Sequence, residues 1–127
     1  MDNAIITLYR RIKLAQITSG YITKLPKIKY IAFGDGGVDS SGNLIAPLEN
    51  QTKLNNEFCR YEIEGFEFPV GTTVRYKVNI PRTEQAGKKF NEMALVDETG
   101  NLCAIKTMYT KQKDEDVIFS FEFDDEF

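Results

Sequence analysis

The chain has 127 residues and a net charge of −3 at neutral pH; 42% of its residues are hydrophobic and 28% are charged. These values are typical of one folded domain, 1–127, and no apolar run approaches the roughly 20 residues that a membrane-spanning helix needs. The negative charge argues against general nucleic-acid binding. No charged-then-apolar leader is present, so we expect no signal peptide and a chain that is cytoplasmic at synthesis.

The N-terminal region has the apolar spacing of an amphipathic helix, predicted over 3–18 with Asp2 or Asn3 as its cap. The stripe expected to lie on a sheet consists of Ile5, Leu8, Ile12 and Ala15. Further side chains lie outside this stripe or on the basic side of the helix. They form a candidate interface with another subunit: Ile6, Leu14, Ile17, Arg10 and Arg11.

A strand is predicted over 27–33, where alternation gives way to a fully apolar run. It is stopped by a structural turn, in which glycines are expected to supply positive φ angles and the aspartate to bond the following backbone: Gly34, Asp35, Gly36 and Gly37. The turn lacks the spacing of phosphate-binding glycine loops.

The following connection, 34–56, is long and polar, which favours a functional or locally ordered loop. Oxygen atoms of Asp35, Asp39 and Asn43 are a candidate calcium site, although their spacing differs from that of the EF-hand loop. A structural interpretation of the loop is preferred.

Strands are then predicted over 57–68, with a β-bulge at Gly65, and over 73–80, which alternates most clearly. Strands over 90–96 and 102–109 form a hairpin whose connection contains two further turn residues, Asp97 and Gly100. The last strand is predicted over 117–123. The predicted fold is therefore mainly β (α+β): one N-terminal helix, then an antiparallel sheet or sandwich of five to six strands.

Charge is unevenly distributed between the two ends of the chain. Residues 1–33 carry six basic side chains and one acidic one, whereas residues 114–127 carry seven acidic side chains and no basic one. Two interpretations stay open: both ends are simply solvated, or they dock within the chain or between subunits.

The sequence contains no histidine and only two cysteines. This removes Ser-His and Cys-His nucleophilic pairs and most transition-metal sites. We therefore expect no catalytic residues, no bound cofactor and no enzymatic activity.

Three segments, in this order, resemble the N-terminal domain of bacteriophage tail-collar and tail-fibre proteins. The first is an apolar-Gly-Asp-Gly turn over 31–36, the second a Leu-x-Asn-Glu-x-x-Arg segment over 54–60, and the third a Glu-x-Gly-Leu-Phe-Asp-x-x-Gly-x-Leu hairpin over 92–102. In the third, Ala94 stands in place of the usual Gly and Val96 in place of Phe.

The resemblance implies a non-enzymatic assembly module of a phage or phage-like tail that attaches a fibre. Family members usually continue into a shaft and a receptor-binding tip, and because this sequence ends at Phe127, a short baseplate adaptor is also expected. The implied partners are other tail or baseplate proteins and further copies of the chain, with no nucleic acid and no membrane insertion. The alternative is a small-ligand or carbohydrate-binding β-domain that uses Tyr21, Tyr30 or Tyr61.

Overall fold

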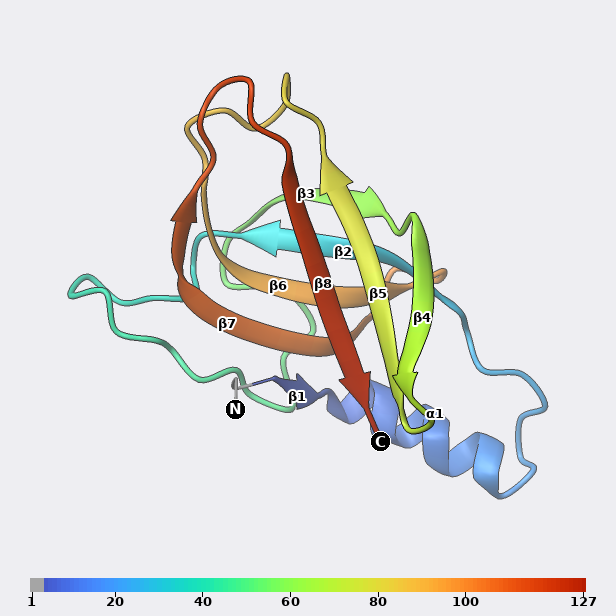
Figure 1. Cartoon of the computed structure of the whole chain (residues 1–127). Coiled ribbons are helices and arrows are strands. Elements are labelled where there is room, and N and C mark those ends of the chain that lie inside the picture. Colours follow the sequence, from blue (N-terminus) through green and yellow to red (C-terminus); the bar gives the residue numbers. More distant parts are fainter. Residues whose placement is uncertain (1–3) are drawn as a thin grey trace.

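The computed structural model describes residues 4–127, in which a short strand and one helix precede two antiparallel β-sheets (Figure 1). The elements are β1 (Ile5–Ile6), α1 (Leu8–Thr18), β2 (Ile28–Gly34), β3 (Glu57–Glu62), β4 (Gly65–Val70), β5 (Thr73–Ile80), β6 (Lys89–Asp97), β7 (Leu102–Gln112) and β8 (Phe119–Glu126). The strand order is β1-β7-β6-β2-β3 in one sheet and β4-β5-β8 in the other. The prediction of a mainly β fold with one N-terminal helix is confirmed.

The two sheets cross each other and enclose an aromatic core. In Figure 1, β5 and β8 run across the direction of β6 and β7. Between them, the ring of Phe33 lies 5.4 Å from that of Phe90 and 4.8 Å from that of Phe121, measured between centroids. These three side chains are almost fully buried, so the core joins β2, β6 and β8.

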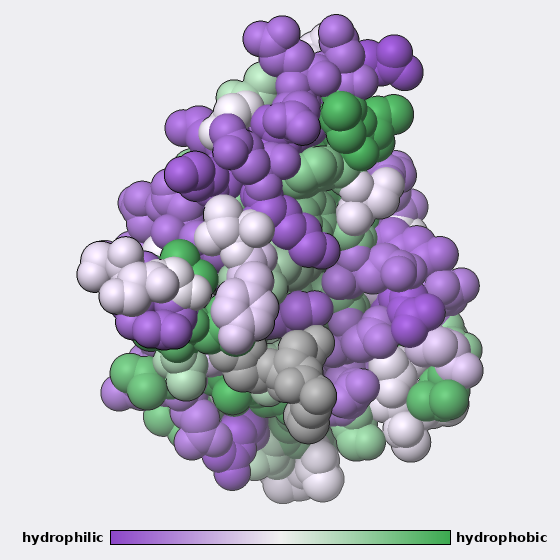
Figure 2. All heavy atoms as spheres, turned by 60° about the vertical axis from the view of Figure 1, so that its left-hand side comes forward, coloured by the Kyte–Doolittle hydropathy of each residue, from purple (hydrophilic) through white to green (hydrophobic). Residues whose placement is uncertain are grey.

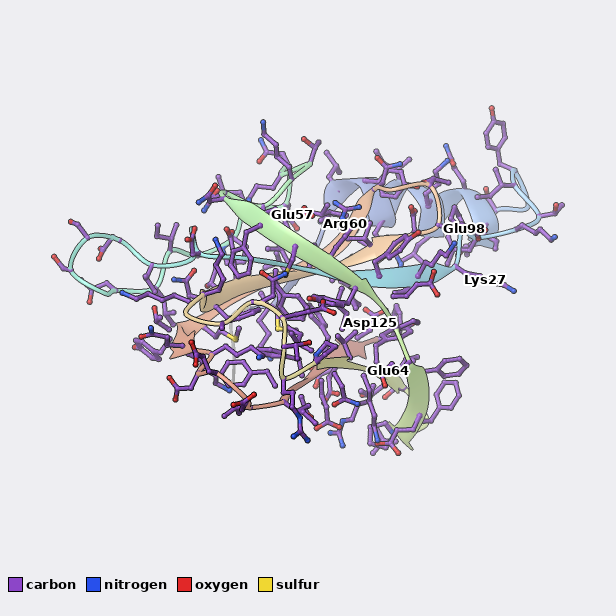
Figure 3. All side chains as sticks on the ribbon, turned by 90° about the horizontal axis from the view of Figure 1, so that it is seen from above. Lys27, Glu57, Arg60, Glu64, Glu98 and Asp125 are labelled. Atoms are coloured by element: carbon purple, nitrogen blue, oxygen red, sulfur yellow. The ribbon has the colours of Figure 1, made fainter. Side chains whose placement is uncertain are left out.

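The segment predicted as one strand over 57–68 is two strands in different sheets. The backbone N–H of Ile63 donates to Lys29 in the five-stranded sheet, while that of Glu64 donates to Lys77 in the three-stranded sheet. Figure 3 shows the chain passing Glu64 from one layer to the other. Gly65 is therefore not at a bulge inside one strand but at the start of β4, and the change in apolar phase marks a change of sheet.

The helix begins at Leu8, later than predicted, because Thr7 caps it. The Thr7 hydroxyl accepts a hydrogen bond from the backbone N–H of Arg10 at 3.2 Å. It also donates to the carbonyl of Leu102, which fixes this cap to β7. The residues before the cap form β1, and the predicted caps Asp2 and Asn3 lie outside the described residues.

The predicted buried stripe of the helix is wrong. Leu8 and Ile12 are each 47% exposed, whereas Arg10 is buried and Tyr9 packs against the core. The helix is therefore rotated relative to the prediction from apolar spacing, and polar contacts described below account for that orientation.

The last strand both begins and ends later than predicted, over Phe119–Glu126 instead of 117–123. Beyond residue 123 the strand stays in register with β5, and Asp124 lies opposite Arg75, which donates two hydrogen bonds to it. The remaining strand boundaries differ from the predicted 27–33, 73–80, 90–96 and 102–109 by at most a few residues at the ends.

Gly100 lies between β6 and β7 with φ of +89°, the left-handed conformation that the predicted hairpin requires. We expect Gly100→Val to lower the free energy of unfolding by about 1–2 kcal/mol, because a β-branched residue is strained at that angle. The matched control is Gly71→Val, since Gly71 has no positive φ and no atom near its ideal Cβ position. Urea unfolding of both variants measures the difference, and equal losses would contradict this explanation.

Candidate functional site

Glu92 is a buried carboxylate in the middle of β6. Its side chain is only 1% exposed, and its neighbours along the strand are buried as well. The carboxylate accepts three backbone N–H groups, from Gly36 at 2.9 Å, Asn55 at 2.9 Å and Asn56 at 2.8 Å. These bonds satisfy a charge that would otherwise be costly to bury.

The three bonds bring together all three segments that carry the family resemblance. We call this cluster the Glu92 junction, and it consists of Gly34, Asp35, Gly36, Gly37, Asn55, Asn56, Asn91 and Glu92. Two amide side chains close it, because Asn55 donates to the carbonyl of Gly36 and Asn56 donates to the carboxylate of Asp35. The junction thus binds the end of β2, the start of β3 and the middle of β6 to one another.

The glycines of the junction are required by close packing, not by their φ angles. The expectation of positive φ there is wrong: among residues 4–127, the glycines with positive φ are Gly20, Gly42, Gly87 and Gly100. At Gly34, a Cβ would lie 2.9 Å from the carbonyl carbon of Asn56. At Gly37, it would overlap the carbonyl oxygen of Asn91. At these positions two backbone segments approach each other so closely that no Cβ atom fits between them.

Gly37→Ala is expected to lower the free energy of unfolding by about 1–3 kcal/mol, because the new methyl group overlaps a backbone carbonyl and forces the turn away from Asn91. That movement also stretches the bond from the Gly37 N–H to the Asn91 side chain, which is 2.7 Å long. Gly71→Ala, at an open position, serves as the control and should change little. Thermal unfolding of the two variants tests this, and equal melting temperatures would count against the packing argument.

The long connection between β2 and β3 begins and ends in the Glu92 junction, and it extends away from the sheets (Figure 1). It is locally ordered: Val38 and Leu44 form a bridge, and the Asp39 carboxylate accepts the backbone N–H groups of Ser41 and Asn43. The hydrogen bond from the Asn43 backbone is the main reason that the pKa of Asp39 is lowered.

The three residues of the candidate calcium site have different roles. Asp35 belongs to the Glu92 junction, whereas Asp39 and Asn43 bond to each other in the extended loop. Within residues 4–127, no three acidic or cysteine side chains are grouped as a metal site would require.

Asp97 connects the β6–β7 hairpin to the helix. Its carboxylate accepts the backbone N–H groups of Thr99 and Asn101, the Thr99 hydroxyl, and the hydroxyl of Tyr9 at 2.7 Å. Burial alone would raise the pKa of Asp97, but the hydrogen bonds from Thr99, Tyr9 and the backbone outweigh it and leave this pKa lowered. The turn residue found in the sequence therefore also orients α1.

The basic and acidic ends of the chain meet in a buried ion pair. Arg10 of α1 donates to the carboxylate of Asp125 in β8 at 3.0 Å, and both side chains are almost fully buried. The Arg10 guanidinium also lies 5.4 Å from the centre of the Phe127 ring. Among residues 4–127, the other oxygen of Asp125 has no hydrogen-bond partner, and burial, opposed by Arg10, raises the pKa of this carboxyl.

Figure 3 shows two further charged pairs at the borders of the sheets: Glu57 beside Arg60 on β3, and Lys27 beside Glu98. The Arg60 guanidinium donates two hydrogen bonds to Glu57, at 2.8 and 2.9 Å. The backbone N–H of Lys27 donates to the Glu98 carboxylate at 2.7 Å, so this contact does not use the lysine ammonium group. The Glu57–Arg60 pair is partly buried, with side chains 26% and 35% exposed, whereas Lys27 and Glu98 are both exposed residues.

The predicted interface residues lie in different environments. Arg10 is buried in its ion pair, while Ile6, Leu14 and Ile17 are half-buried. Arg11 is exposed and pairs with Glu49 of the long connection at 2.7 Å. Of the three tyrosines named for ligand binding, Tyr21 is exposed, and Tyr30 and Tyr61 are half-buried.

Beyond the place of Glu92 at the start of the third family-like segment, the sequence indicated no role for Glu92 or for Asp125. A signal for Glu92 was present, since it is an acidic residue within the otherwise mostly apolar run 90–96. Asp125 had no such signal, because it is one of several acids near the C-terminal end.

The helix of the described region, residues 4–127, has neither the length nor the apolar character that a transmembrane helix requires. No curated protein and no solved structure matches the chain. Residues 1–118 match the family described as phage tail-collar fibre protein, N-terminal. The chain therefore belongs to the N-terminal family of phage tail-collar fibre proteins and is a structural component of a phage tail.

Proposed function

We propose that this chain is an assembly module that joins a tail fibre to the baseplate, either as the attachment domain of the fibre or as an adaptor between the two. The observation that carries the proposal is the family match over residues 1–118. The geometry supports it, because the segments that resemble the family make up the Glu92 junction and its surroundings. These segments thus have a common structural purpose, which is to hold the loop, the hairpin and β3 in fixed relative positions.

A rigid frame of this kind suits a protein that binds neighbours through its surface. On the face shown in Figure 2, hydrophobic side chains lie as separate patches among hydrophilic ones. Exposed apolar side chains on and near the helix include Leu8, Ile12 and Leu48. We propose that the helix takes part in contacts between tail proteins, including further copies of this chain, with Arg11, Ile6, Leu14 and Ile17 at its border.

The test is to delete the gene for this chain from the phage or prophage that encodes it and to examine the particles by electron microscopy. The proposal predicts tails of normal length that lack fibres at the baseplate, and recovery of the fibres when the wild-type gene is supplied in trans. Tails that carry a normal set of fibres after the deletion would contradict it.

A further inference from the structure

β4 forms an edge of the three-stranded sheet and exposes an unusual apolar surface. Phe66, Phe68 and Val70 are 60%, 62% and 58% exposed. Phe66 and Phe68 alternate along one face of the strand, whereas a register shift between Glu67 and Val70 pairs Val70 with Thr73 on the other face. The rings of Phe66 and Phe68 contact each other edge-to-face, with centroids 5.9 Å apart. We call the side chains of Phe66 and Phe68 the β4 ledge.

The β4 ledge continues the apolar core beyond the part that the five-stranded sheet covers. Phe66 pairs in register with Tyr76 of β5, which in turn pairs with Phe123 of β8. Phe123 is 1% exposed and belongs to the core, and Tyr76 packs against it. The apolar layer therefore runs from the buried interior through Tyr76 to solvent at β4.

The opposite face of the same strands is charged and already paired. Glu67 lies 3.0 Å from the ammonium group of Lys77, and Arg75 donates two hydrogen bonds to Asp124. Among the described residues, the core-side face of β4 thus remains largely exposed, although the Phe66 ring contacts that of Tyr76 in its own sheet, with centroids 6.1 Å apart. Exposed apolar side chains on an edge strand favour pairing with another strand.

We propose that the β4 edge binds an extended segment of a neighbouring tail protein, which adds to the sheet as a further strand and covers the β4 ledge. This inference rests on the proposed function and names the contact through which it operates. Backbone hydrogen bonds to β4 hold the segment in place, and its alternate apolar side chains lie on Phe66 and Phe68.

The exposed area favours an added strand over a second folded copy of this chain. The two phenylalanine side chains, each about 60% exposed, offer roughly 250 Å². A stable interface between two folded proteins needs about 800 Å² on each side. A bound strand obtains the rest of its stabilisation from main-chain hydrogen bonds, which a flat contact between globular surfaces does not provide.

Charge also argues against pairing of β4 with itself. In an antiparallel pair centred on Glu67, the two Glu67 carboxylates would stand directly opposite each other. The segment that fits therefore has apolar residues on one face and a basic or neutral residue beside Glu67 on the other.

The test uses the full chain and purified tail particles assembled without it. The double variant Phe66→Ser with Phe68→Ser is expected to bind these tails at least tenfold more weakly than the wild type. The control is Tyr109→Ser, an aromatic residue of β7 that is 70% exposed, which should bind as the wild type does. Hydrogen exchange of the wild-type chain gives a second readout, because tail binding should slow exchange of the Gly65–Phe68 amides.

The possible results separate this inference from the proposed function. If the wild-type chain does not bind tails, both are wrong. If it binds, but the double variant binds equally well or the β4 amides exchange at an unchanged rate, the β4 proposal alone is wrong. Sedimentation of the isolated chain completes the test: an oligomer that the double variant converts to a monomer would make a second copy the occupant and overturn the proposed partner.

Discussion

Replacing Glu92 by Ala is expected to lower the free energy of unfolding by about 4–6 kcal/mol, a large part of the 5–15 kcal/mol typical of a domain. The variant leaves three backbone N–H groups, of Gly36, Asn55 and Asn56, without their acceptor in a partly buried site. Each unsatisfied buried donor costs about 1–3 kcal/mol, and a cavity adds to the loss. Urea unfolding followed by circular dichroism provides the measurement.

Glu92→Gln tests whether the charge or the shape matters. Its amide keeps one acceptor oxygen but turns an NH₂ group toward at least one backbone N–H, so we expect a loss of about 1–3 kcal/mol. The control is Glu115→Gln, at an exposed position, which should change the stability by less than about 0.5 kcal/mol. A Glu92→Ala protein as stable as the Glu115→Gln protein would show that the junction does not hold the fold together.

Replacing Arg10 by Met is expected to destabilise the protein by about 3–5 kcal/mol at pH 7, because it leaves the Asp125 carboxylate buried without a cation. The matched control is Arg11→Met, one residue further along the helix. Arg11 and Glu49 are both more than half exposed, so the loss of that pair should cost less than about 1 kcal/mol.

The effect of Arg10→Met should depend on pH in a defined direction. Burial already raises the pKa of Asp125, and Arg10 is the group that opposes this rise. Without Arg10, the folded-state pKa rises further above that of the unfolded chain, so the folded state binds a proton more readily. The stability loss caused by Arg10→Met is therefore largest at pH 7. It shrinks as the pH falls through the folded-state pKa of Asp125 toward about 4, the pKa of this carboxyl in the unfolded chain. A difference from the wild type that is constant between pH 7 and pH 4.5 would contradict this.

Much of the strand arrangement could be predicted from local pattern. The alternation in β5 and the connection that contains Gly100 predicted a strand and a hairpin because those features depend on neighbouring residues alone. The prediction of one strand over 57–68 was wrong for a physical reason. The change of sheet depends on which distant strand each backbone group forms a hydrogen bond with. Alternation gives the side-chain faces of a strand but not the identity of its partner.

The orientation of α1 shows the same limit for helices. Apolar spacing predicts that Leu8 and Ile12 face the sheet, yet the helix buries Arg10 and directs Tyr9 toward Asp97. The partners of these two side chains, Asp125 and Asp97, lie far away in the sequence. For the same reason the role of Glu92 could not be predicted, because its three donors come from two other segments.

The most direct test of the proposed function is to add the purified, gold-labelled chain to tail particles that were assembled without it and to locate the label by electron microscopy. The assembly proposal predicts saturable labelling confined to the baseplate end, competed by unlabelled chain and lost with the Glu92→Ala variant, whose frame is weakened. Labelling no higher than background, or spread along the whole tail, would contradict it.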